Sequence, residues 1–548
     1  MHEPLHIHRI LGGGPFAEAG KPSALARDDA RGLIAVGGSV GDLQWGGRAL
    51  NSWYGYRVGV YGLDDLRCRQ LVRTRWPVLD LALHPHLPLL AVGTGAYDGG
   101  YMYEGELLIV DLEDGTTTSV LEGLWEVRRV RWREDGRALE LVVAPPDDDA
   151  DDAPETHGFA PVLERDDWRR VAPRSISYKD LTGPRVRASR RPEGVKQAAR
   201  ETLAALADAH GATWSPRRQV WALEALDDGR VLAALEGTKL ESWSPSGESQ
   251  WSVPDPDGAR ELHISPDRTS AWVNVARPSR WAHGVGWEEV PGLVERVSLA
   301  DGSTLDTVDA GFPAALAAGL DGRLALRDTR LERRNTRMTL LAPDGTRSAG
   351  PALGCYDSLN MYFGVRRSPE LLFLQGGKKE YWKDQWVVAV DPAKREGRRP
   401  ETRRLFPLDW DGKRSRRLTG GPAVRLAGSD GTGGALVHAG EIHVDRGPKA
   451  DPAFVACRRF PDGAPRWVFP VDHPVTALDS DGDTVFAALL SGEIVALDAA
   501  DGTVRRRAPL SVGGVPTVAL SLAATAPGQL VLGTVDGRIL LGELPPPQ

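Results

Sequence analysis

The feature that most constrains this chain is a hairpin pattern that returns along almost its whole length. The stretch "SGEIVALDAADGTVRR" (491–506) reads as two short alternating strands around an Asp-Gly turn. Related stretches are "ELLIVDLEDGTTTSVL" (106–121), "LVERVSLADGSTLDTV" (293–308) and "MTLLAPDGTRSAG" (338–350). Asp-Gly between alternating apolar residues is a strong hairpin signal, because glycine supplies the positive φ that tight turns need. The chain is therefore predicted to be built from antiparallel hairpins.

A second kind of hairpin precedes most copies of the first. Examples are "WALEALDDGRVLAALEG" (221–237), "FGVRRSPELLFLQGG" (363–377) and "TALDSDGDTVFAALL" (476–490). In each, a half-buried strand leads through a polar turn into a nearly continuous apolar strand, which is typical of a strand covered on both faces. Paired, the two hairpins give units mostly 35 to 55 residues apart, starting near residues 23, 77, 126, 217, 258, 314, 355, 421, 474 and 515. This spacing is that of blades in a β-propeller.

Particular copies resemble known repeat families. The stretch "VFAALLSGEIVALDAADGTVRR" (485–506) resembles a PQQ-like propeller repeat, and "LHISPDRTSAWVNVA" (262–276) and "VRWREDGRALELVVA" (130–144) resemble WD40-like or TolB-like blade openings. The resemblance implies an all-β fold, a β-propeller of four-stranded antiparallel blades. We expect one dominant ring of seven or eight blades, with two rings as the alternative.

The pattern also predicts how the chain is divided. Residues 1–171 should hold the N-terminal strand and the first blades, and residues 217–548 the remaining blades, with residues 5–11 completing the last blade. Residues 172–216 break the repeat and are predicted to be an insertion with one amphipathic helix, because apolar residues recur there at helical spacing. Those residues are Val195, Ala199, Leu203 and Leu206.

Composition excludes several classes of protein. A net charge of -8 and a pI near 5.9 argue against a general nucleic-acid or anionic-membrane binder. Three cysteines far apart, Cys68, Cys355 and Cys457, predict buried thiols in a reducing compartment and no disulfide framework. No secretory signal and no apolar run of about 18 residues stand out, so we expect a cytoplasmic protein. Abundant Ala, Arg and Gly suggest a bacterial source.

Four long insertions rich in aromatic residues are predicted between the second and third strands of their blades. They span residues 41–56, 95–105, 277–292 and 377–386. In a propeller all such connections emerge on one face, and Trp and Tyr dominate the energetics of protein interfaces. The rings could equally cover the undersides of their own loops. The predicted partner-binding residues are Trp45, Trp53, Tyr54, Tyr101, Trp281, Trp287, Trp382 and Trp386.

A basic segment, residues 394–417, is a second candidate surface. It holds ten Lys or Arg against four acidic residues, with Phe406 and Trp410 interleaved. Such a segment suits nucleic acid, an acidic protein partner or plain solvation, and the salt dependence of binding separates the first from the others. Its candidate residues are Arg398, Arg399, Arg403, Arg404, Arg414, Arg416 and Arg417.

Signals of catalysis or metal binding are weak. The pairs His6/His8 and His84/His86 have H-x-H spacing but lack further ligands in sequence. "DSDGD" (479–483) resembles the start of a calcium loop yet stands at a hairpin turn. We therefore expect no catalytic residue, metal or cofactor. We expect a non-catalytic scaffold that binds a partner protein encoded nearby, in bacterial signalling or defence. The alternative is a propeller enzyme or small-ligand binder that uses the central channel.

Overall fold

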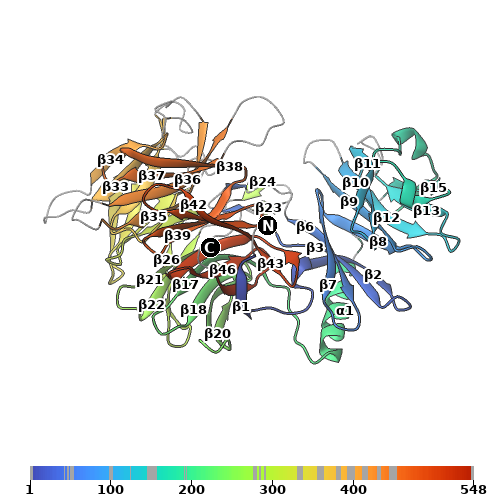
Figure 1. Cartoon of the computed structure of the whole chain (residues 1–548), viewed down its shortest axis with the longest axis horizontal. Helices are drawn as coiled ribbons and strands as arrows, with labels where there is room; N and C mark the ends of the chain where they lie inside the picture. Colours follow the sequence, from blue (N-terminus) through green and yellow to red (C-terminus); the bar gives the residue numbers. More distant parts are fainter. Residues whose placement is uncertain are drawn as a thin grey trace. The chain divides into compact units, whose positions relative to one another are not determined.

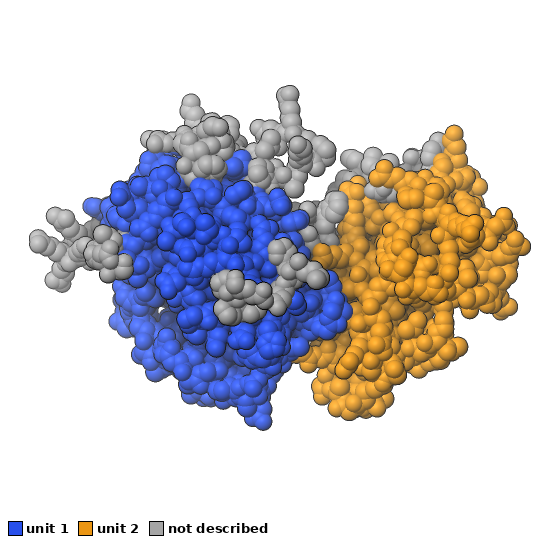
Figure 2. Space-filling model, viewed as in Figure 1, with its two compact units in different colours: residues 1–12, 44–50, 218–548 blue, residues 13–43, 51–217 orange. Residues whose placement is uncertain are grey.

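The computed structural model divides the chain into two compact units (Figure 2). Unit 1 holds Met1–Gly12, Gln44–Leu50 and Arg218–Gln548, and unit 2 holds Gly13–Leu43 and Asn51–Arg217. The structure describes residues 4–41, 44–45, 48–49, 55–97, 103–123, 125–144, 157–189, 192, 194–275, 280–282, 286–288, 292–329, 337–354, 363–377, 384–391, 401–409, 417–428, 434–443 and 453–544.

Ten sheets of three to five strands make up almost all of the described chain, and they are antiparallel apart from one strand pair (Figure 1). Nine of the ten sheets have a strand that begins within a few residues of a predicted unit start. The exception is the fourth sheet of unit 1, which begins at Leu371 and not near residue 355, because the strand Gly364–Arg366 pairs with the fifth sheet. The chain is therefore all-β with one α-helix, as the hairpin pattern predicts.

Unit 2 contains three sheets, which we name A, B and C. Sheet A is β2 (Lys21–Asp28), β3 (Leu33–Ser39), β6 (Tyr56–Gly62) and β7 (Cys68–Thr74). Sheet B is β8 (Val78–Leu83), β9 (Leu89–Tyr97), β10 (Tyr103–Asp111) and β11 (Thr117–Gly123). Sheet C is β12 (Val127–Trp132), β13 (Ala138–Val143), β14 (His157–Phe159) and β16 (Arg185–Arg187), with β15 (Val162–Glu164) also on β13. Shared apolar clusters join A to B and B to C.

The two outer faces of this three-sheet stack, on sheet A and on sheet C, are covered differently. The helix α1 (Val195–Ala209) buries Ala199, Leu203 and Ala207. Leu203 belongs to the cluster on the free face of sheet A, and Leu206 packs against that cluster. The predicted helix is thus present, although its first apolar residue, Val195, is exposed. The free face of sheet C is charged instead, because Arg131 is exposed and Arg133 pairs with Glu140 at 2.9 Å. A charged face has no apolar area to bury against a further sheet.

Unit 1 contains seven sheets, numbered here in chain order. Sheet 1 is β17 (Arg218–Ala225), β18 (Val231–Glu236), β19 (Thr238–Trp243) and β20 (Ser249–Pro254). Sheet 2 is β21 (Glu261–Ile264), β22 (Ser270–Val275), β25 (Leu293–Ser298) and β26 (Thr304–Asp309). Sheet 3 is β27 (Ala314–Ala318), β28 (Leu324–Asp328), β29 (Arg337–Leu341) and β30 (Arg347–Ala352). Sheet 4 has three strands, β32 (Leu371–Gln375), β33 (Trp386–Asp391) and β34 (Glu401–Pro407).

The last three sheets complete the unit. Sheet 5 is β31 (Gly364–Arg366), β35 (Arg417–Leu426), β36 (Ala435–His443), β37 (Ala453–Arg459) and β38 (Pro465–Val471). Sheet 6 is β39 (Val475–Ser480), β40 (Thr484–Leu489), β41 (Glu493–Asp498) and β42 (Val504–Pro509). Sheet 7 is β45 (Ala519–Ala526), β46 (Gln529–Thr534), β47 (Ile539–Glu543) and, at its edge, β1 (His6–Leu11), which lies beside the C-terminal strands (Figure 1).

Buried apolar clusters join the seven sheets in chain order. Six clusters link sheets 1 to 2, 2 to 3, 3 to 4, 4 to 5, 5 to 6 and 6 to 7, and a seventh links sheet 7 back to sheet 1. The first strands of neighbouring sheets, such as β39 and β45 or β45 and β17, also contact each other. Each sheet of unit 1 thus buries both faces, which one four-stranded sheet by itself cannot do.

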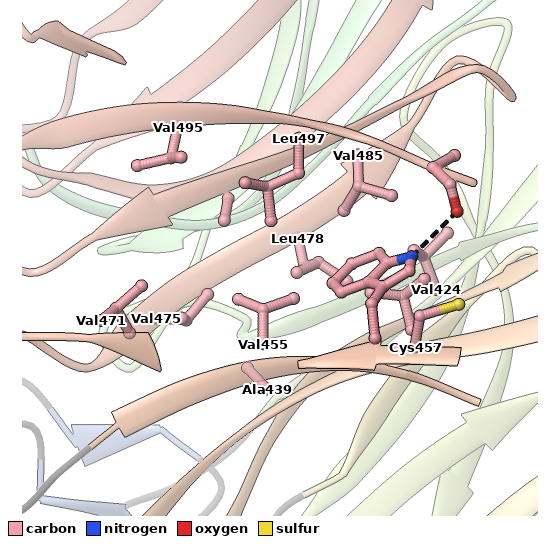
Figure 3. Packing of buried hydrophobic residues seen from close by; sticks show 14 of the residues in the cluster. Val424, Ala439, Val455, Cys457, Val471, Val475, Leu478, Val485, Val495 and Leu497 are labelled. Atoms are coloured by element: carbon pink, nitrogen blue, oxygen red, sulfur yellow. Dashed lines mark hydrogen bonds between the residues drawn. The ribbon is translucent and has the colours of Figure 1, made fainter. Parts of the chain in front are cut away.

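The Asp-Gly turns show why this hairpin recurs. In four copies the aspartate side chain accepts the backbone N–H two residues later, which fixes the turn between the third and fourth strands. In two of these four copies the glycine of the turn faces an aromatic ring of the preceding sheet: Gly302 faces Trp251, and Gly502 faces Trp467. The Trp467 indole also donates to the Ala499 carbonyl at 3.1 Å, and both residues belong to the cluster between sheets 5 and 6 (Figure 3).

We expect Gly502→Ala to be clearly more destabilising than Gly482→Ala. Both glycines have positive φ, 76° and 107°, so each substitution strains the backbone by about 1–2 kcal/mol. A Cβ at Gly502 would also approach Trp467 within 2.6 Å, whereas one at Gly482 meets nothing within 4 Å. The overpacking adds about 1–3 kcal/mol. Chemical denaturation of the two variants checks this, and equal losses of unfolding free energy would contradict it.

Candidate functional site

The predicted aromatic anchors fall on the connections between second and third strands, but they divide between the units. Insertions 277–292 and 377–386 belong to unit 1 and 95–105 to unit 2, while 41–56 is shared between them. Trp45 lies in a short hairpin, β4 (Gln44–Trp45) with β5 (Arg48–Ala49), where it is opposite Arg48. Four of the predicted anchors lie outside the described residues: Trp53, Tyr54, Tyr101 and Trp382.

The insertion of sheet 2 forms a hairpin of its own. Its strands are β23 (Arg280–Ala282) and β24 (Gly286–Glu288), and their register sets Trp281 directly opposite Trp287. A connection that merely joined two strands would need only a few residues. This insertion instead has ordered strand pairing with its two tryptophans at one position of the ladder.

Trp386 is the one predicted anchor whose side chain the structure describes. It begins β33 and is half-buried, because the Arg404 guanidinium of the neighbouring strand lies 5.5 Å from its ring centroid. Arg404 also donates to Gln375 at 2.8 Å. Trp386 is therefore partly covered by its own sheet, the arrangement that the sequence left open as the alternative to partner binding.

The basic segment is described only in part. Arg403 and Arg404 are exposed on β34, the outermost strand of sheet 4, and Arg403 lies 3.5 Å from Asp391. Charged side chains on an edge strand hinder pairing with other edges, which is one reason for arginines at this position. Arg417 begins β35, while four of the predicted residues lie outside the described part: Arg398, Arg399, Arg414 and Arg416.

In unit 2 two tyrosines within the 95–105 insertion, Tyr97 and Tyr103, lie at the ends of the strands that it joins. The Tyr97 and Tyr103 rings are 5.0 Å apart, and the Arg128 guanidinium lies 5.3 Å from the Tyr103 ring. Arg128 is fully buried and donates to Glu126 at 2.7 Å. Tyr97 remains 37% exposed. The buried Arg128–Glu126 ion pair therefore lies against Tyr103 at the base of this insertion, and Tyr97 is exposed beside it.

A cluster that sequence reasoning missed crosses unit 1. It consists of five residues on first strands or beside them: Glu224 on β17, His263 on β21, Arg366 and Arg367 at β31, and Asp479 on β39. We name it the cross-ring cluster. Arg367 makes a two-point contact with Asp479, at 2.7 and 2.9 Å, and also donates to the Ala524 carbonyl on β45.

Arg366 joins the other side of the cross-ring cluster. Its guanidinium lies 2.8 Å from the Glu224 carboxylate and 3.6 Å from Asp479, and it donates to the Leu223 carbonyl. Burial raises the pKa of Glu224, the two arginines oppose the rise and the Asp479 charge reinforces it. The hydrogen bond that Arg367 donates to Asp479 raises the pKa of Arg367. The cluster thus ties sheets 1, 5, 6 and 7 together by mutually satisfied charges.

Asp479 also makes a kind of hydrogen bond that recurs in both units, from a backbone N–H of one first strand to a carboxylate on the preceding first strand. Its Oδ2 accepts the backbone N–H of Ala524 at 3.0 Å, so a carboxylate on one first strand binds the first strand of the next sheet. Glu261 does the same to Leu316, and Asp80 of unit 2 to Val130. Burial raises the pKa of Asp80, and that of Glu261 to about 7. An acidic residue in an otherwise apolar first strand was the sequence signal for this role.

The histidine and aspartate motifs serve the turns. His84 is buried, its Nδ1 accepts two backbone N–H groups of its own turn, and its Nε2 lies 2.9 Å from the Gly136 carbonyl. In "DSDGD", Asp481 accepts the N–H groups of Asp483 and Thr484, as a turn aspartate does. Within the described ranges, no three His, Cys, Asp or Glu side chains are grouped so as to hold a metal ion.

We expect the unfolding free energy to fall as the pH drops below about 6.5. His438 is buried between sheets 4 and 5, where desolvation, assisted by Arg458, lowers its pKa to about 3, and burial lowers that of His263 to about 4. Below its unfolded pKa the unfolded chain binds a proton that the folded His438 does not, at about 1.4 kcal/mol per pH unit.

His438→Leu should therefore flatten the pH dependence between pH 6.5 and 4, as measured by denaturation at a series of pH values. Glu261 acts in the opposite direction, because its raised pKa makes the folded state the better proton binder between pH 4.5 and 7. Glu261→Gln should steepen the same curve. A profile unchanged by His438→Leu would show that this histidine titrates alike in both states.

Comparison with known proteins does not assign this chain to a family. No helix in the described ranges has the length and apolar content to cross a bilayer. No known family model matches this chain, and no curated protein matches its sequence.

Proposed function

We propose that unit 1 is a seven-bladed β-propeller and that the chain is a non-catalytic cytoplasmic scaffold, which binds a partner protein through its aromatic insertions. The propeller is supported by the clusters that link sheets 1 to 7 in order and sheet 7 back to sheet 1. In this arrangement the first strands line the axis, and single repeats resemble the blades of PQQ-like, WD40-like and TolB-like proteins.

The observation that carries the binding proposal is the hairpin β23–β24. This insertion forms a strand pair of its own, with Trp281 opposite Trp287 in its ladder. Strand pairing restricts the backbone before binding, so less conformational entropy is lost when a partner covers the aromatic residues. The partner is a protein and not a polyanion, since the chain has a net charge of -8.

We expect the loss of insertion tryptophans to abolish capture of the partner. The test immobilises wild type, a Trp45→Ala/Trp53→Ala/Trp281→Ala/Trp382→Ala variant and a control, and exposes each to extract of the native organism. Each buried interface tryptophan contributes about 2 kcal/mol or more, so retention should fall more than tenfold. The control, Leu305→Ala/Val504→Ala, removes exposed apolar side chains from outermost strands and should retain the partner. Equal retention by all three proteins would refute the aromatic surface.

A second candidate function is supported by the cross-ring cluster, which brings ionisable groups of several sheets together as a channel enzyme or small-ligand binder requires. Its charged groups already pair with each other, which favours a structural role, in which the cluster holds the sheets together, over ligand binding. The two functions separate cleanly: a channel ligand should lose its stabilising effect in Glu224→Gln and keep it in the tryptophan variant, whereas a protein partner should show the reverse.

A further inference from the structure

Sheet 4 departs from the plan that the other sheets of unit 1 follow. Its first strand is missing, because residues 364–366 form β31 and pair in parallel with β35 of sheet 5. The repeat instead predicts that "FGVRRSPELLFLQGG" folds as a hairpin, with this segment antiparallel to β32. In sheet 6 the corresponding hairpin pairs Ser480 with Val485 across four residues. The same register in sheet 4 would pair Arg366 with Leu371.

The parts of that hairpin are already in place. Ser368 donates to the Glu370 carbonyl at 2.9 Å and accepts the Glu370 N–H, so the turn between β31 and β32 is formed. On β32, the Leu374 carbonyl accepts a hydrogen bond from Arg327 of sheet 3. Arg327 of sheet 3 therefore donates a hydrogen bond to β32, the strand with which residues 363–367 would pair in the hairpin.

The position of sheet 4 is also shifted. In sheets 1 and 5 the third residue of the last strand, Trp251 or Trp467, meets the turn glycine of the next sheet. In sheet 4 the sixth residue, Phe406, makes the equivalent contact with Gly463. Three residues of strand correspond to about 10 Å. The last strand of sheet 4 is therefore offset along its own direction relative to the next sheet.

The observed position of residues 363–367 is held by two charged side chains and by Phe363 and Val365, which pack against the apolar cluster between sheets 4 and 5. The ladder of β31 with β35 is only three residues long, from Gly364 to Arg366, and a ladder this short is weak. Arg367, which follows directly, has φ 57°, a strained conformation for a residue other than glycine. Arg366 and Arg367 are the two arginines of the cross-ring cluster. Their contacts with Glu224 and Asp479 therefore offset a short ladder and a strained backbone.

We propose that residues 363–367 are an exchangeable strand: they pair with β35 while Arg366 and Arg367 hold the cross-ring cluster, and they pair with β32 when those contacts are broken. The exchange trades ion pairs across the unit for the hairpin that the repeat encodes. In the exchanged state, residues 363–367 become the first strand of sheet 4 and no longer belong to sheet 5. The contacts of Arg366 and Arg367 with sheets 1, 6 and 7 are then lost. This inference is independent of any partner.

Competition between two disulfides tests the exchange. In a protein with Cys68→Ser, Cys355→Ser and Cys457→Ala, the substitutions Val365→Cys, Leu372→Cys and Ala423→Cys let one cysteine choose between two partners. The 365–423 bond reports the observed register, because Val365 and Ala423 are opposite each other. The 365–372 bond reports the hairpin. Mild oxidation and peptide mass spectrometry give the ratio of the two bonds.

We expect the 365–423 bond to dominate when both arginines are present. Arg366→Gln/Arg367→Gln should raise the ratio of 365–372 to 365–423 about tenfold or more, the factor that about 1.4 kcal/mol produces. High salt should shift the ratio in the same direction. Arg505→Gln, which removes the ion pair with Asp498 on the outer strands of sheet 6, is the matched control and should leave the ratio unchanged.

Three results would overturn the proposal. The first is a ratio that the arginine substitutions leave unchanged while circular dichroism and the melting temperature show a folded chain. The second is an equal shift in Arg505→Gln, which would mean general loosening. The third is absence of the 365–423 bond when both arginines are present. If Arg366→Gln/Arg367→Gln does not fold, Asp479→Asn takes its place, because it weakens the contact with Arg367 and leaves β31 itself unaltered.

Discussion

Deleting residues 1–11 is expected to lower the melting temperature by about 5 °C or more. These residues form β1, which pairs with β47 from His6 to Leu11 and supplies the edge strand of sheet 7. Leu5, directly before the strand, is buried in the cluster between sheets 6 and 7, and Leu11, its last residue, in the cluster between sheets 7 and 1. Two leucines of the N-terminal segment thus join the C-terminal sheet to both of its neighbours.

Single substitutions on β1 sharpen this expectation. Leu11 is 2% exposed, so Leu11→Ala should cost about 2–5 kcal/mol of unfolding free energy. Ile10, the preceding residue of the same strand, is 43% exposed, and Ile10→Ala should cost less than about 0.5 kcal/mol. Calorimetry on the deletion and denaturant titration of the two variants give the values. An unchanged melting temperature after the deletion would mean that β1 contributes nothing to closure.

Asp479→Ala is expected to be the most damaging single substitution in the cross-ring cluster, at about 3–5 kcal/mol. The side chain is fully buried and accepts hydrogen bonds from both Arg367 and the Ala524 backbone. Its removal leaves a guanidinium without its counter-charge and a buried N–H without its acceptor. Both losses are expensive away from water.

A surface ion pair of the same chemistry is the control for Asp479. Asp498 pairs with Arg505 on the outer strands of sheet 6, where both side chains keep a quarter to a third of their surface in water. Asp498→Ala should therefore cost no more than about 1 kcal/mol. Denaturation of the two variants under one set of conditions compares them. Similar losses at the two positions would show that the buried cluster is not a special source of stability.

The local structure of this chain could be predicted well from its sequence. Alternating residues, Asp-Gly turns and short apolar runs are local signals, and they located the ten repeat units and the helix α1. The hairpin at 491–506 is one example: Asp501 binds the Thr503 N–H, and Gly502 takes up the positive φ between β41 and β42. Each of these features depends on residues within a few positions of one another.

The candidate site was predicted only in part, for a physical reason. Long aromatic insertions are visible as composition, so the segments around Trp45, Trp281 and Trp386 could be named. Whether Trp386 faces a partner or its own sheet depends on Arg404, which reaches it from the next strand. The cross-ring cluster has no linear signature, because Arg367 and Asp479 are 112 residues apart.

By itself, the sequence determined what each segment of about 40 residues does: it forms antiparallel strands with one buried face or two. Only the tertiary structure decided how those segments are grouped. The charged face of sheet C and the cover of α1 end unit 2 at three sheets, whereas apolar faces carry unit 1 through seven and back to the first. The tertiary structure also placed β31 on the neighbouring sheet against its local hairpin pattern. Contacts between side chains far apart in sequence outweighed local pairing there, because the charges of Arg366 and Arg367 find their partners only across the unit.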